Sequence, residues 1–95
     1  MSRRTQAGYN VTVHGRVQGV GFRYTAQKKA LQLGLTGWVR NLGDGTVEAR
    51  FEGSPEKCSD FLQWLHHGPP GSRVLRVDER KIEPQETYKT FNITY

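Results

Sequence analysis

The residues with the clearest chemical potential form a glycine-rich stretch from Val13 to Arg23. The stretch holds three glycines within seven residues, Gly15, Gly19 and Gly21. Alternating residues precede it and residues of helical period follow it, so the sequence predicts a strand, a turn and a helix that opens near Arg23. Backbone N–H groups exposed by glycine at a helix N-terminus attract anions, phosphate above all. The stretch therefore predicts a phosphate-binding loop with Arg23 as its cationic clamp.

Spacing excludes the common phosphate-binding and phosphatase templates. A Walker loop counted from Gly15 needs a glycine where Val20 stands, and the dinucleotide fingerprint needs a glycine at the position of Tyr24. A cysteine-based phosphatase needs an arginine six residues after its nucleophile, but Trp64 holds that position relative to Cys58. Cys58 falls on the apolar stripe of a predicted helix, which is typical of a small core residue.

The histidines do not have the spacing of a metal site. His66 and His67 are adjacent at a predicted helix end, and His14 stands alone beside the glycine-rich loop. No pair of carboxylates follows or precedes that loop closely. We therefore expect a site with no metal, no cofactor, no nucleophilic side chain and no obvious general base.

Composition indicates one domain over residues 1–95, with residues 1–7 expected to form a flexible tail. The formal charge of +5 attracts small anions as readily as nucleic acid, and no long block of like charges favours a nucleic-acid partner. No apolar run has the length of a membrane span, so we expect no membrane partner. The single cysteine fits a reducing cytoplasm, and we expect a cytoplasmic monomer.

Hydrophobic periodicity predicts the order β-α-β-β-α-β with a short extra strand at the C-terminus. The predicted strands cover residues 9–14, 35–40, 46–52, 74–82 and 91–95, and the first helix covers residues 22–33. The second helix starts at Ser54-Pro55-Glu56 and stops at His66-His67-Gly68. This order predicts an α+β fold of the ferredoxin-like type, an antiparallel sheet with both helices on one face.

The predicted topology has a consequence for the site. The first two strands run in the same direction with the third between them, so the glycine-rich loop and the end of the second strand meet at one edge of the sheet. Asn41 follows that second strand. We therefore expect Asn41 to lie near Arg23, although a whole helix separates them in the sequence.

Two stretches carry a resemblance to a known family. The first is Val13-x-Gly15-x-Val17-Gln18-Gly19-Val20-x-Phe22-Arg23, and the second is Gly37-Trp38-Val39-Arg40-Asn41-x3-Gly45-x-Val47-x5-Gly53. Both resemble, without departure, the two signatures of the acylphosphatase family. Length and element order agree as well, so the resemblance covers nearly the whole chain.

The resemblance implies hydrolysis of the carboxyl-phosphate anhydride bond of acylphosphates to carboxylate and inorganic phosphate. It implies that Asn41 holds the attacking water and that phosphate is bound by Gly15, Arg16, Val17, Gln18, Gly19, Val20, Gly21 and Arg23. A site with so few catalytic groups is sufficient for this reaction, because the leaving carboxylate has a conjugate-acid pKa of about 4 and needs no general acid. Inorganic phosphate would then be a product and a competitive ligand.

Two other functions compete with hydrolysis. A ferredoxin-like RNA-binding module would carry stacking aromatics on its central strands, but residues 45–52 lack that pattern and expose acids. A non-catalytic domain that senses carbamoyl or acyl phosphate, as in larger maturation proteins, would keep the same loop. The chain ends at Tyr95 without a further domain, which favours a free-standing enzyme. If Tyr95 lies near the site, its terminal carboxylate could pair with Arg23.

Overall fold

The computed structural model describes residues 6–95 and contains seven elements in the predicted order. Their bounds are β1 Ala7–Arg16, α1 Phe22–Gln32, β2 Thr36–Asn41, β3 Val47–Gly53, α2 Pro55–His67, β4 Arg73–Ile82 and β5 Phe91–Ile93. Residues 1–5 of the predicted flexible tail lie outside the described residues. Ala7, also assigned to that tail, belongs instead to the sheet, where it is buried.

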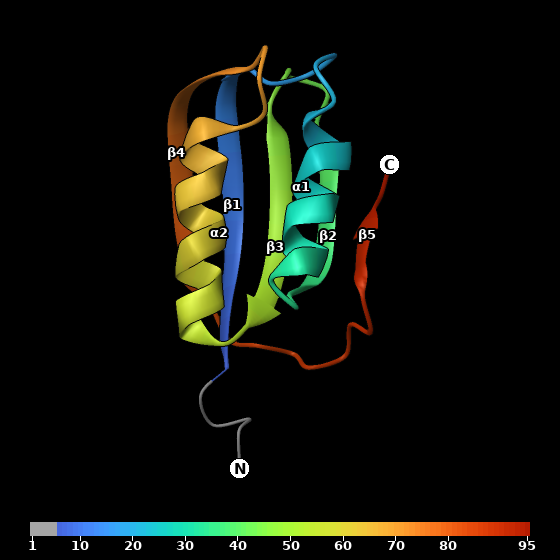
Figure 1. The fold of residues 1–95 in the computed structure, drawn as a ribbon, viewed down its shortest axis with the longest axis vertical. Coiled ribbons are helices and arrows are strands. Elements are labelled where there is room, and N and C mark those ends of the chain that lie inside the picture. The colour runs from blue at the N-terminus through green and yellow to red at the C-terminus, as the bar shows by residue number, and fades with distance from the viewer. Residues whose placement is uncertain (1–5) are drawn as a thin grey trace.

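The sheet has the strand order β4-β1-β3-β2-β5. Strand β1 pairs antiparallel with β3 and β4, and β3 pairs antiparallel with β2. Both helices cover one face of this sheet (Figure 1). The ferredoxin-like fold is therefore confirmed, with β3 between the two co-directional strands β1 and β2.

The last strand makes the sheet mixed, where the sequence predicted an antiparallel one. Residues 83–90 run from β4 to β5 across one end of the sheet, the end opposite the glycine-rich loop (Figure 1). Strand β5 then pairs parallel with β2. The buried carboxylate of Glu52 anchors this crossing, because its oxygens accept from the backbone N–H groups of Gln85 at 2.8 Å and Glu86 at 2.9 Å. A chain that crosses at that edge can only run back toward the loop, so β5 has the direction of β2.

An irregularity explains why β4 is poorly patterned in the sequence. The register between β1 and β4 shifts between His14 and Gly15, so that Leu75 is left out of the pairing. Leu75 is 70% exposed, while Val74 and Val77 on either side both pack against the core. A bulge shifts the alternation by one residue, so a strict period of two cannot describe this strand.

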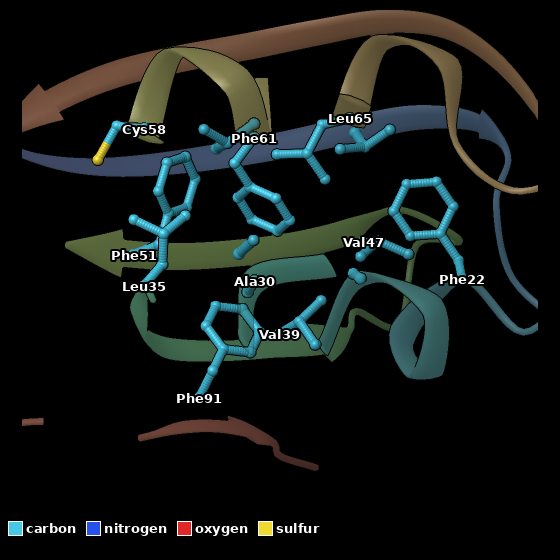
Figure 2. Close-up of a cluster of buried hydrophobic side chains, with 14 of the residues drawn as sticks. Phe22, Ala30, Leu35, Val39, Val47, Phe51, Cys58, Phe61, Leu65 and Phe91 are labelled. Carbon is cyan, nitrogen blue, oxygen red and sulfur yellow. The ribbon is translucent and has the colours of Figure 1, made fainter. Parts of the chain in front are cut away.

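The core lies between the sheet and the two helices. Phe61 of α2 lies at its centre (Figure 2). The centroid of its ring is 4.8 Å from that of the Phe51 ring and 5.9 Å from that of the Phe91 ring. Two buried side chains, Val17 and Phe22, come from the glycine-rich loop and its junction with α1. This packing fixes both ends of the loop against the core.

Candidate active site

The glycine-rich loop presents unpaired backbone donors at one edge of the sheet. Gly19 and Gly21 both have φ of 76°, in the left-handed region where glycine is favoured. Within residues 6–95, no hydrogen bond uses the backbone N–H groups of residues 18–21. The loop therefore exposes a row of N–H groups that a tetrahedral anion can accept from.

Helix α1 begins at this loop, and the helix has no acidic side chain at its N-terminus. Its N-cap is Gly21, no side chain caps it, and its first turn holds no acidic residue. Arg23 lies in that first turn, at the positive end of the helix dipole, where a cation is unfavourable on its own. An anion between the helix end and the guanidinium would be stabilised by both.

Asn41 is the last residue of β2 and faces the same edge. Its Oδ1 atom is buried and has no hydrogen-bond partner among the described residues. A buried acceptor left unpaired costs about 1–3 kcal/mol, so a bound donor such as water would satisfy it.

One small cavity of about 170 Å³ brings these groups together. Its walls are Val17, Gly19, Gly21, Phe22, Arg23, Tyr24, Asn41, Ile93 and Tyr95. Arg23 and Asn41 thus share a cavity, as the topology predicted. The loop donors, a cation and a free acceptor converge on a space that suits a phosphoryl group and a water.

Four other residues assigned to phosphate binding do not line the cavity, although the free backbone N–H groups of Gln18 and Val20 belong to the loop. Gly15 and Arg16 belong to β1 and pair with β4. Gly15 has φ of 129°, and a Cβ there would also clash with the carbonyl oxygen of Arg73. The side chain of Gln18 turns away from the cavity toward the chain after β2. Val20 packs against the core.

Four residues of the cavity wall were not among the predicted site residues: Phe22, Tyr24, Ile93 and Tyr95. Of these, only Tyr95 had been considered as a neighbour of Arg23. The alternation of Phe91, Ile93 and Tyr95 was the available signal, since the buried Phe91 puts the other two on its own side of the strand. The guanidinium of Arg23 lies over the Tyr95 ring, 5.1 Å from its centroid. Among the described residues Arg23 has no ion pair, so the contact with Tyr95 is through the ring and not through a carboxylate.

Two histidines pair with carboxylates away from the cavity, and the only cysteine is buried in the core. His14 pairs with Asp78 at 3.0 Å and His66 with Glu79 at 3.2 Å. Burial raises the pKa of the Cys58 thiol to about 11, so this side chain is a neutral core residue. Within residues 6–95 no cluster of His, Cys, Asp and Glu could hold a metal ion, and no helix is long and apolar enough to cross a bilayer.

Comparison with known proteins agrees with the geometry of this edge. The family model described as "Acylphosphatase" matches residues 9–93. An acylphosphatase of Thermococcus kodakarensis is 51% identical over 76 residues, which cover 80% of this chain and 84% of that one. The solved structure of an acylphosphatase from Coxiella burnetii superposes with a TM-score of 0.92 at 39% identity, covering 97% of this chain and 96% of the other.

A larger protein contains a similar unit. The crystal structure of Thermococcus kodakarensis HypF superposes with a TM-score of 0.81 at 34% identity, covering 94% of this chain but 12% of that chain. The matched family model spans nearly all the described residues, including the loop and the end of β2. The chain belongs to the acylphosphatase family.

Proposed function

We propose that this protein hydrolyses the carboxyl-phosphate anhydride bond of acylphosphates to a carboxylate and inorganic phosphate. In this proposal the phosphoryl oxygens accept hydrogen bonds from the loop N–H groups and from the Arg23 guanidinium. Asn41 holds the attacking water through its side-chain carbonyl. The family and the names of its relatives support the reaction, and the cavity geometry supports the roles of these two residues.

The free acceptor on Asn41 is the observation that carries the mechanism. Asn41 lines the cavity that Arg23 also lines, and its buried Oδ1 has no partner within residues 6–95. A water that donates one hydrogen to Oδ1 keeps a lone pair for phosphorus. Positioning of this kind is a large part of catalysis in phosphoryl transfer, where the protein itself has little covalent chemistry to perform.

Charge stabilisation comes from preorganised donors. As the P–O bond to the carboxylate lengthens, negative charge spreads over the non-bridging oxygens, and the loop and Arg23 already face that position. The leaving carboxylate needs no proton, since its conjugate acid has a pKa of about 4. The attacking water must lose a proton, and a phosphoryl oxygen of the substrate is the acceptor that we propose.

The same geometry also fits a domain that binds phosphate without turnover. A unit of this fold occurs within HypF, so a sensing role is a specific alternative for the cavity. An RNA-binding role is less well supported, because the helix-free face of the sheet stacks the Arg40 guanidinium 4.9 Å over the Trp38 ring and pairs the same arginine with Glu48. The aromatic face that RNA would need is occupied by a side chain of the protein itself.

One assay separates these functions. Purified protein is incubated with benzoyl phosphate, and both substrate loss and phosphate release are measured with and without a chelator. An acylphosphatase turns the substrate over at a rate that the chelator leaves unchanged. A sensing domain binds inorganic phosphate without turnover, and an RNA-binding module does neither. A rate that depends on added metal would contradict the mechanism.

We also propose that the protein is a monomer and works in the cytoplasm. Its exposed large hydrophobic side chains within residues 6–95 are Tyr24, Leu31, Leu75 and Tyr95. They lie on α1, β4 and the end of the chain, two of them at the cavity. The buried thiol of Cys58 fits a reducing compartment. Sedimentation equilibrium and fractionation of cells that express the protein test these two points.

A further inference from the structure

The side chain of Gln18 links the two halves of the cavity. Its Nε2 atom donates one hydrogen bond to the carbonyl oxygen of Leu42 at 2.8 Å and a second to that of Thr46 at 2.9 Å. Leu42 directly follows Asn41 in the chain. Both hydrogens of the amide are thus used on the turn that leaves the end of β2.

This turn is already closed by its own hydrogen bonds. The backbone N–H of Leu42 donates to Thr46 at 2.9 Å, and that of Gly45 donates to Leu42 at 3.2 Å. The carboxylate of Asp44 accepts from the backbone N–H of Thr46 at 3.0 Å and from its hydroxyl. These hydrogen bonds keep the pKa of Asp44 below its ordinary value. These hydrogen bonds hold the turn together, and Asn41 directly precedes it.

Gln18 makes the only side-chain hydrogen bonds that join residues 17–21 to residues 41–46 in the described part of the chain. Its backbone N–H belongs to the row of free loop donors, while its side chain points the other way into the turn. Gln18 thus belongs to the proposed phosphate-binding loop, and its side chain is hydrogen-bonded to the turn that follows Asn41.

We infer that Gln18 is a positioning residue, whose side-chain amide sets the distance between the phosphate-binding loop and Asn41. This inference rests on the proposed function. The loop itself is held independently, through the buried side chains of Val17 and Phe22 and through α1. Loss of the amide therefore leaves phosphate binding in place and displaces the water. A misplacement of about 1 Å at a reacting centre costs about 100-fold in rate.

The donor chemistry of position 18 can be tested with two variants of similar length. Gln18→Met keeps the length and removes both donors. Gln18→Glu replaces them at neutral pH with a carboxylate, whose lone pairs face the two carbonyl oxygens of the turn. When this carboxyl group is protonated, it regains one O–H donor. The burial and the facing carbonyls favour the protonated form, so we expect it to form at a pH above the ordinary glutamic acid range.

The expected results differ between the variants. Both lower kcat by about 10- to 100-fold at neutral pH, while the inhibition constant of inorganic phosphate changes less than about threefold. As the pH falls from 7 to 4, the kcat of Gln18→Glu rises relative to wild type, and that of Gln18→Met does not. Ser54→Ala, which removes the N-cap of α2 far from the cavity, is the matched control for a general loss of stability. We expect it to lower the melting temperature with kcat unchanged.

Circular dichroism at each pH shows which variants are folded. The pH series of Gln18→Glu compares one variant with itself, so a general defect of that variant cannot account for a change with pH. The inference is overturned if folded Gln18→Met has the kcat of wild type, or if phosphate inhibition weakens as much as kcat falls. It is also overturned if the two variants show the same pH profile. Failure of the proposed function itself would appear separately, as the absence of benzoyl phosphate turnover by the wild-type protein.

Discussion

The guanidinium of Arg23 lies over the ring of Tyr95, with Cζ 5.1 Å from the ring centroid. The two residues are brought together because β5 runs parallel to β2 and ends at the edge where α1 begins. The contact orients the guanidinium at the cavity without neutralising it, since the described residues give Arg23 no ion pair. The full positive charge is therefore available to a bound phosphoryl group.

This contact predicts that the aromatic face of Tyr95 contributes to phosphate affinity. Tyr95 is 92% exposed, so the cation–π interaction is worth about 0.5–1 kcal/mol. We expect Tyr95→Leu to weaken inhibition by inorganic phosphate about two- to fivefold, while Tyr95→Phe retains the wild-type value. Inhibition constants measured in the benzoyl phosphate assay provide the test. Equal losses in both variants would instead assign the effect to the hydroxyl group.

Replacement of Arg23 by lysine keeps the charge but removes the planar fork of donors. An ammonium group cannot contact two phosphoryl oxygens in the bidentate manner of a guanidinium. We expect kcat/KM for benzoyl phosphate to fall about 100- to 1000-fold, as for the loss of an oxyanion donor. Arg80→Lys makes the same change on exposed β4 and is expected to leave kcat/KM unchanged. Wild-type turnover in Arg23→Lys would refute the role of Arg23.

Removal of the Asn41 side chain separates water positioning from phosphate binding. We expect Asn41→Ala to lower kcat about 100-fold, because the water loses its acceptor, with little change in phosphate inhibition. In Asn41→Asp the added negative charge repels the phosphoryl group, so phosphate inhibition weakens as well. Steady-state kinetics with phosphate as a competitive inhibitor measure both effects. If Asn41→Ala loses phosphate affinity to the extent of Arg23→Lys, Asn41 is a phosphate ligand instead.

The proximity of Arg23 and Asn41 could be predicted from the sequence, because it depends only on the order and direction of the strands. The order of elements fixes that β1 and β2 run the same way, so Arg23 and Asn41 had to meet at one edge, and they do. Local alternation could not predict the bulge at Leu75, because it arises from the fit of β4 against Gly15. Gly15 was assigned to the phosphate-binding loop, but in the structure it belongs to β1 and permits the close approach of β4.

The residues from the C-terminal strand depend on contacts that are remote in the sequence. Tyr95 reaches the cavity because residues 83–90 cross one edge of the sheet, and that crossing is held by the buried carboxylate of Glu52. In the sequence Glu52 is one acid in an alternating strand, with nothing to distinguish it from Glu48. The place of β5 follows from this tertiary hydrogen bonding and could not be derived from the pattern of its own residues.

The raised pKa of Cys58 predicts how stability depends on alkaline pH. Burial is the main cause of the rise from 9.0 to about 11, and the charge of Glu52 adds to it. The unfolded chain therefore releases the thiol proton at a lower pH than the folded protein does. The free energy of unfolding is accordingly unaffected by this group below pH 9 and falls as the pH rises from 9 toward 11. We expect a loss of roughly 2–3 kcal/mol over that range. Urea unfolding of wild type and Cys58→Ala measures it, since other titrations cancel in the difference, and a difference independent of pH would contradict the prediction.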